Sequence, residues 1–105
     1  DRALFSASSM VFLKNSFRVA LLKASCEDPS YLYPRFLLMD NIEDKGMEEE
    51  RSQLFQRLII KLSKDVKVKH QIIFTTSMID PALDNSSYCV GEFYHSGNKS
   101  LKYCN

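Results

Sequence analysis

The fold is decided by the segment between residues 35 and 76, which contains RFLLMD (35–40), EEERSQLFQRLIIKLS (48–63) and QIIFTT (71–76), joined by polar connections. The first and last of these pieces are short apolar runs of the kind found in buried strands. The middle piece places acidic residues ahead of an apolar helical periodicity. A strand, a helix and a second strand in this order form a βαβ unit, so we predict two parallel strands with the helix packed on one face.

A second helix is predicted upstream, over residues 10–26. This stretch, MVFLKNSFRVALLKASC, contains neither glycine nor proline. Its apolar residues recur at the spacing of one helix face: Met10, Leu13, Phe17, Ala20, Leu21 and Ala24. Three serines stand just before it, Ser6, Ser8 and Ser9, and serine oxygens cap free N–H groups where a helix starts.

Two further expectations complete the predicted fold. Residues 88–94 (YCVGEFY) and 101–104 (LKYC) flank a turn-rich stretch and predict a peripheral C-terminal hairpin. In the helix over 48–63, the apolar residues are predicted to belong to the core and not to a groove for a partner: Leu54, Phe55, Leu58, Ile59 and Leu62.

Length and composition limit the class of protein. The chain has 105 residues, of which 45% are hydrophobic and 26% charged, as in a single small globular domain. A formal net charge of +1 gives no reason to expect a polyanion partner, so any nucleic-acid role would have to be local. The longest apolar runs, such as 36–39, are far too short for a bilayer, and three cysteines without CxxC spacing indicate neither a disulfide framework nor a zinc site. We therefore expect a cytoplasmic protein, and the abrupt start at Asp1 suggests a longer native chain.

The chemistry expected of this sheet centres on Asp40. It ends an apolar strand, and functional residues of parallel sheets gather at the carboxyl ends of the strands. A carboxylate in that place is what a nucleotide-binding sheet uses to hold a Mg²⁺-coordinated water. The alternative is a strand-end carboxylate that caps the following loop.

The order of motifs resembles the C-terminal half of ATP-binding-cassette (ABC) heads of the structural-maintenance-of-chromosomes (SMC) class, which includes the double-strand-break repair ATPases with long coiled coils. The matching segments are 5–9 (FSASS) for the signature loop, 35–40 for the Walker B strand, 45–48 (KGME) for the D-loop and 70–76 (HQIIFTT) for the strand leading to the switch position. The signature serine precedes the Walker B aspartate by 34 residues (40 − 6), and the switch position follows it by 36 (76 − 40), which is similar to the family.

The resemblance implies a role for each motif. Ser6 and the N–H groups of the residues after it, Ala7, Ser8 and Ser9, would face the γ-phosphate of ATP held on a second head. Asp40 would hold the Mg²⁺ shell through water. The D-loop residues would contact the opposite subunit: Lys45, Gly46, Met47 and Glu48. The alternatives are an ordinary helix cap for the serines and a solvated turn for the D-loop, with Gly46 at a special backbone angle.

Departures from the family pattern concern hydrolysis. Asn41 stands where the family has its catalytic glutamate, and an amide cannot accept a proton from water. Glu43 and Asp44 follow on the same loop, either as a substitute base or as solvated loop acids. Thr76 replaces the switch histidine, and no GxxxxGK[ST] motif occurs in the chain.

The expected fold is therefore α/β: an ABC-type P-loop NTPase C-terminal half-domain, with residues 1–105 forming one lobe. The resemblance implies ATP and Mg²⁺ as cofactors and two partners: the N-terminal Walker A lobe of the same protein and a second ATPase head in a homodimer. ATP hydrolysis is expected only when both are present. The implied processes are DNA repair, chromosome maintenance or anti-phage defence, with DNA bound by the full assembly. Two alternatives stay open: a catalytically dead lobe used for assembly, and a free-standing α/β interaction domain.

Overall fold

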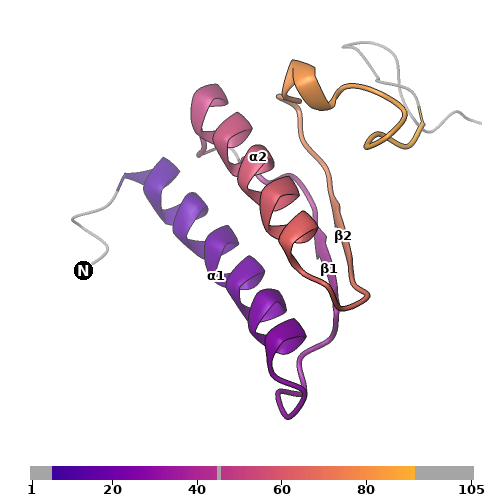
Figure 1. Cartoon of the computed structure of the whole chain (residues 1–105). Coiled ribbons are helices and arrows are strands. Elements are labelled where there is room, and N and C mark those ends of the chain that lie inside the picture. Colours follow the sequence, from indigo (N-terminus) through magenta and orange to yellow (C-terminus); the bar gives the residue numbers. More distant parts are fainter. Residues whose placement is uncertain (1–5, 45, 92–105) are drawn as a thin grey trace, which may run out of the picture.

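Two helices cover one face of a two-stranded parallel sheet in the computed structural model, which describes residues 6–44 and 46–91 (Figure 1). The elements are α1 (Ala7–Glu27), β1 (Phe36–Met39), α2 (Glu49–Asp65), β2 (Gln71–Phe74) and the short 3₁₀ helix η2 (Pro81–Leu83). The strands pair in parallel, from Phe36 opposite Gln71 to Met39 opposite Phe74. The predicted βαβ unit and the upstream helix are thus confirmed.

A serine caps the start of helix α1, and the N–H of its C-cap residue, Asp28, donates to the Ala24 carbonyl at 2.9 Å. Ser6 is its N-cap, and the Ser6 hydroxyl oxygen accepts a hydrogen bond from the Ser9 N–H at 3.2 Å. At the other end Asp28 accepts from the hydroxyl and the N–H of Ser30, at 2.7 and 3.0 Å. These two hydrogen bonds, the hydroxyl first, hold the pKa of Asp28 below its usual value.

The apolar face of α1 that the spacing identifies is the outer face, not the buried one. Leu13 and Phe17 are 54% and 64% exposed. The side buried against the sheet and α2 includes Val19, Leu22 and Cys26. Because α1 carries apolar residues on nearly every side, a spacing of three and four residues fits two of its faces equally well.

Helix α2 forms as predicted, with Glu49 and Glu50 in the first turn, where they favour the positive end of the helix dipole. Phe55 and Ile59 are buried in the core. The prediction that the whole apolar set is core is wrong for Leu54 and Leu58, each of which is 46% exposed. The apolar arc of α2 is wider than a layer of two strands and one neighbouring helix can cover.

The core lies between the helices and one face of the sheet. It comprises Val19, Leu22, Cys26, Leu37, Met39, Ile42, Phe55 and Ile59. Alternate strand residues point to the opposite face, where Phe36, Leu38 and Ile73 are exposed. The strands were predicted as buried, but the described residues cover them on one side only.

The predicted C-terminal hairpin receives no support from the residues that are described. Tyr88–Gly91, the start of its first strand, form turns and irregular backbone, with the Tyr88 N–H donating to the Asn85 carbonyl at 3.2 Å. The remainder of the hairpin lies outside the described residues.

Candidate functional site

The carboxyl ends of both strands and the amino-terminal ends of both helices lie at the same end of the molecule (Figure 1). This follows from the alternation of helix and strand, because each helix runs opposite to the strand that follows it. The loop after β1 is held against α1 by the Asn15 amide, which donates to the Ile42 carbonyl at 2.8 Å. This contact fixes the middle of α1 beside the loop, and the start of α1, at Ala7, lies against Gly46 further along the same loop.

Asp40 is exposed at the end of β1 and is paired with Thr75 at the end of β2. The Thr75 hydroxyl donates to Asp40 Oδ1 at 2.8 Å, and its oxygen accepts from the Asn41 N–H at 2.6 Å. The register explains the pairing, since Met39 stands opposite Phe74 and the next residues are Asp40 and Thr75. Both side chains emerge on the open face of the sheet, two residues after Leu38 and Ile73.

Glu43 is buried, so the interpretation as a solvated loop acid is wrong for this residue. Its side chain is 3% exposed, and Oε1 accepts hydrogen bonds from the hydroxyls of Ser52, at 2.7 Å, and of Thr76. Its second oxygen, Oε2, is buried and has no hydrogen-bond partner among the residues that the structure describes. Asp44, by contrast, is exposed as expected.

Thr76 faces the helices and not Asp40. Besides donating to Glu43, its oxygen accepts from the Met78 N–H at 3.0 Å. The predicted switch position therefore belongs to the covered side of the sheet. The neighbouring Thr75, which the sequence motif did not single out, is the threonine that meets Asp40. The alternation of side chains along β2 is the signal that distinguishes the two.

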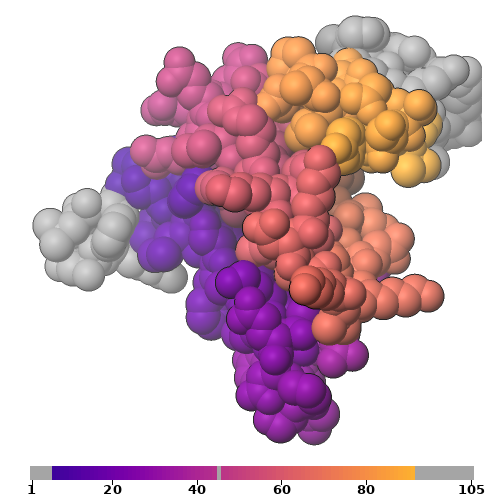
Figure 2. Space-filling view, in the orientation of Figure 1, coloured from indigo at the N-terminus to yellow at the C-terminus, as the bar shows by residue number. Residues whose placement is uncertain are grey.

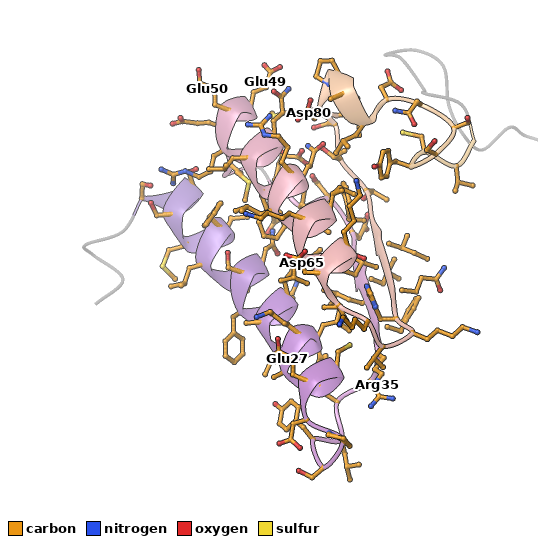
Figure 3. All side chains as sticks on the ribbon, viewed as in Figure 1. Glu27, Arg35, Glu49, Glu50, Asp65 and Asp80 are labelled. Carbon is orange, nitrogen blue, oxygen red and sulfur yellow. The ribbon has the colours of Figure 1, made fainter. Side chains whose placement is uncertain are left out.

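Gln56 of α2 connects this covered side to the loop after β2. It is fully buried, its amide nitrogen donates to the Ser52 hydroxyl and the Met78 carbonyl, both at 3.0 Å, and its oxygen accepts from the Asp80 N–H at 2.8 Å. Asp80, labelled in Figure 3, accepts from the Ala82 N–H at 3.0 Å and from Arg57 at 2.7 Å. These contacts, the Ala82 N–H first, hold the pKa of Asp80 below its usual value.

Asn41 and Asp44 adopt left-handed backbone conformations, with φ of 50° and 41°. Asparagine and aspartate tolerate this region better than other residues with side chains. The two left-handed residues bend the loop so that Glu43 points inward while Asp40 stays outside. Asn41 itself is exposed and offers no proton acceptor for water.

The serines of the signature-like segment meet an arginine that the sequence analysis did not identify. Arg51, in the first turn of α2, donates to the hydroxyl oxygens of Ser8 and Ser9 at 3.2 and 3.0 Å. No carboxylate of the described residues forms an ion pair with it. Ser6 is an ordinary N-cap, as one of the two interpretations expected, and Ala7 is exposed beside it. The start of α1 thus combines the positive end of a helix dipole with a guanidinium that forms no ion pair within residues 6–44 and 46–91.

The D-loop residues are partly described. Gly46 lies against α1, and a Cβ added there would come within 3.1 Å of the Val11 side chain and 3.2 Å of the Ala7 carbonyl oxygen. The glycine serves this close approach, because its φ is not in the left-handed region. Met47 is buried, Glu48 is exposed, and Lys45 lies outside the described residues.

The oxygen ligands near Asp40 suit only a Mg²⁺ site in which the protein supplies one or two ligands. Within residues 6–44 and 46–91 no three His, Cys, Asp or Glu side chains gather as a metal site. Mg²⁺ is commonly held by one or two carboxylates together with waters and substrate phosphates, and the exposed Asp40 suits that arrangement. Elsewhere in the described part, Cys26 and Cys89 are free thiols, and neither helix has the length and apolar composition to cross a bilayer.

Comparison with known proteins assigns the chain to no family and to no fold. No protein-family model, no curated protein and no solved structure matches this chain. The function is therefore argued from the arrangement of the residues described above.

Proposed function

We propose that the chain is the C-terminal lobe of an SMC-like ABC ATPase head, which works by ATP-dependent engagement of two heads. The observation that carries the proposal is the exposed Asp40, held by Thr75 of the adjacent parallel strand, at the end of the sheet where α1 begins. A carboxylate fixed at the carboxyl end of a parallel strand is suited to a Mg²⁺-bound phosphate. In this proposal Asp40 holds the Mg²⁺ shell through water, and ATP supplies the remaining oxygen ligands.

The exposed face of the sheet is an argument for a partner lobe that would cover it. Parallel sheets are normally covered on both faces, whereas here Phe36, Leu38 and Ile73 are exposed and the described sheet has only two strands. Asp40 and Thr75 stand on the edge of this same face. An N-terminal Walker A lobe of the same protein, adding a strand and a helix there, would bury the apolar side chains and bring its phosphate loop to Asp40.

The start of α1 supports contact with a second head. Ser6, Ala7, Ser8 and Ser9 lie at the positive end of α1 beside the Arg51 guanidinium, and no described carboxylate pairs with that guanidinium. The Ser9 N–H already donates to Ser6, so the N–H groups of Ala7 and Ser8 are the remaining backbone donors of the segment. In the proposal this site receives the γ-phosphate of ATP bound to the facing head. The segment from Gly46 to Glu48 would then contact the opposite subunit of the homodimer.

A second candidate is a lobe that binds ATP for assembly without hydrolysing it. Three observations favour it: Asn41 cannot act as a base, Glu43 is buried against Ser52, and Thr76 faces away from Asp40. The exposed Asp44 is the remaining carboxylate of this loop. In both candidates the setting is cytoplasmic, in DNA repair, chromosome maintenance or anti-phage defence, with DNA bound by the complete assembly.

The proposal is tested by co-producing the chain with its Walker A lobe and following dimerisation by analytical ultracentrifugation. With MgATP we expect dimers, and Ser6→Asp should abolish them because it keeps a good N-cap while repelling phosphate. Ser87→Asp, on an exposed serine in a turn after η2, is the matched control. ATP-dependent dimers that persist in Ser6→Asp would refute the signature assignment.

Phosphate release separates the two candidates. The ATPase predicts release that is lost in Asp40→Ala. The assembly-only lobe predicts ATP-dependent dimers with no release above that of the Asp40→Ala protein.

A further inference from the structure

A serine and a histidine meet at the end of the sheet opposite Asp40. Ser63 lies in the last turn of α2, and His70 directly precedes β2. The Ser63 hydroxyl oxygen is 2.7 Å from His70 Nε2, and the other ring nitrogen, Nδ1, is 2.6 Å from the Val68 carbonyl oxygen. A hydroxyl, an imidazole and a carbonyl are therefore joined in one hydrogen-bonded chain.

The Val68 carbonyl decides which nitrogen of the His70 ring carries the proton. A carbonyl oxygen only accepts hydrogen bonds, so Nδ1 must be the N–H that donates to it. In the neutral ring Nε2 is then an acceptor, and the Ser63 hydroxyl donates to it. This is the tautomer in which a histidine can take the proton of a serine hydroxyl.

The surroundings of the ring favour transfer of that proton. The imidazole becomes a cation when it takes a proton, and Ser63 places it beside the last turn of α2, which is the negative end of the helix dipole. The Val68 carbonyl stays hydrogen-bonded to the Nδ1–H and adds a second partial negative charge. These two groups stabilise the imidazolium as the carboxylate of a Ser–His–Asp triad does, with partial charges in place of a full one.

The pair can be reached from solvent. Both Ser63 and His70 are partly exposed, and Figure 2 shows the end of α2 and the connection that follows it at the surface of the molecule. Val68 also lines a pocket of about 380 Å³ between the end of α1 and residues 65–68. Neither Ser63 nor His70 lines that pocket, so we expect a small acyl group that approaches from solvent and not a large bound substrate.

From this geometry we infer that Ser63 and His70 form a nucleophile and base pair that takes a small acyl group from an activated ester or thioester. Ser63 Oγ attacks the carbonyl carbon while its proton passes to His70 Nε2. The new C–O bond remains as the bond to the leaving group breaks, and the leaving alkoxide or thiolate takes the proton from Nε2. Water then attacks the acylated Ser63 with His70 as base, which releases the carboxylic acid and restores the hydroxyl.

The leaving group must be a good one because the pair supplies a nucleophile and a base but no hydrogen-bond donor for the oxyanion. A single such donor contributes about a hundredfold or more to the rate of acyl transfer. The reaction is therefore expected to be slow beside that of a hydrolase, and to be measurable with phenyl esters and thioesters. The competing interpretation is that the same hydrogen bonds only tie the end of α2 to the start of β2.

The test is the reaction of the full chain with p-nitrophenyl acetate, stopped with acid at successive times and followed by mass spectrometry of the fragments. We expect Ser63 to be acetylated at least tenfold faster than Ser16, because general-base catalysis contributes about a hundredfold or more. Ser16 is the matched comparison, since it is a partly exposed serine of α1 with no histidine partner among the described residues. Equal rates at the two serines, or no acetyl group on Ser63, would overturn the proposal.

A change at His70 separates a base from a structural bridge. His70→Gln keeps a side chain that can accept from Ser63 but has no basic nitrogen, so we expect acetylation of Ser63 to slow at least tenfold. Ser16→Ala is the control and should leave the rate at Ser63 unchanged. A folded His70→Gln chain in which Ser63 reacts within twofold of the natural rate would show that the ring is only a bridge, and would overturn the proposal.

Two features keep this test decisive. Should His70→Gln lose its helical circular dichroism, His70→Asn takes its place with the same expectation, and the comparison of Ser63 with Ser16 needs no variant. The reaction requires neither ATP nor a second head, and the pair lies at the opposite end of the strands from Asp40. This inference and the proposed ATPase function can therefore fail separately.

Discussion

Where the strands end, the polar residues on the two sides of the sheet differ in burial and in the number of hydrogen bonds that they form. On the side covered by the helices, Glu43 and Thr76 are joined to Ser52 and Gln56 in a buried network. On the open side, Asp40 and Thr75 form a single exposed pair. Buried polar groups must find partners within the protein, whereas exposed groups can exchange water for a ligand. The covered side is therefore suited to holding the loops in place, and the open side to binding.

The same contrast divides the apolar residues. Those on the covered side of the sheet form the core, while Phe36, Leu38 and Ile73 on the open side are exposed. The outer surface of the helix layer is a third region, where apolar residues occur together with cations. Each region calls for a different experiment, and the variants below separate the roles of the two sides of the sheet.

The largest effect is expected at the centre of the covered network. Gln56→Ala leaves the Asp80 N–H and the Met78 carbonyl without a partner and removes one of the two hydrogen bonds of the Ser52 hydroxyl. We expect the free energy of unfolding to fall by about 3 kcal/mol, because each stranded group costs about 1 kcal/mol and the buried side chain leaves a cavity. Urea denaturation measures the change, and Gln53→Ala, on the same helix, is the control. Equal stabilities of the two variants would show that the network does not hold the fold.

The next prediction compares how much Glu43 and Asp40, at the end of β1, contribute to the free energy of unfolding. Glu43→Ala removes the acceptor of two hydroxyls and should lower the free energy of unfolding by about 2 kcal/mol. Asp40→Ala removes one exposed hydrogen bond and should change it by no more than about 0.5 kcal/mol. Thermal denaturation of both variants measures the difference. A larger loss for Asp40→Ala than for Glu43→Ala would reverse the assignment of structural and binding sides.

A smaller effect is expected at the left-handed Asn41, which separates the two carboxylates. Asn41→Glu restores the side chain of a catalytic glutamate but places it at φ of 50°, so we expect a loss of about 1 kcal/mol in the free energy of unfolding. Asn41→Gly should be at least as stable as the natural chain, since glycine has no Cβ to strain. Urea titrations of both variants compare them. A glutamate variant more stable than the glycine variant would contradict the loop geometry.

The smallest effect is the acid sensitivity of the loop that Gln56 fixes. The pKa of Asp80 is lowered in the folded protein, first by the Ala82 N–H and then by Arg57. Its ionised form therefore stabilises the fold above the ordinary Asp pKa of about 4, and that contribution is lost as the pH falls through the lowered pKa. We expect Asp80→Asn to flatten the decrease in melting temperature below about pH 5, since Asn can still cap Ala82.

Arg57 provides a control for this acid effect, and Asp28 limits how much of the effect Asp80→Asn can remove. Arg57→Gln should keep most of the pH dependence, because the larger cause remains. Asp28, whose pKa is lowered by Ser30, contributes in the same range and leaves part of the slope in place. A slope unchanged by Asp80→Asn would contradict the role of Asp80.

The sequence predicted the elements of the fold better than their faces. Glycine-free apolar periodicity identifies α1, and two apolar runs around a helix identify the parallel strands. The buried side of α1 was not predictable in this way, because Leu13 and Phe17 fit a helix face as well as Val19 and Leu22 do. That choice is made by tertiary packing, which local spacing does not contain.

The candidate site was predictable where it depends on the strands. Asp40 follows from the end of β1, and its pairing with Thr75 follows from the register of the two strands. The burial of Glu43 depends on the left-handed residues on either side of it, which no sequence pattern indicated. Arg51 was overlooked because its partners, Ser8 and Ser9, lie more than forty positions away in the chain.

The most direct test of the account is the affinity of the complete head for ATP in the presence of Mg²⁺, measured by isothermal titration calorimetry below the melting temperature of every variant used. If the open side of the sheet is the binding side, Asp40→Ala weakens ATP binding at least tenfold and Glu43→Ala, although less stable, changes it no more than twofold. If ATP binds the Asp40→Ala head as tightly as the natural one, or if Glu43→Ala is the variant that loses it, the central claim is wrong.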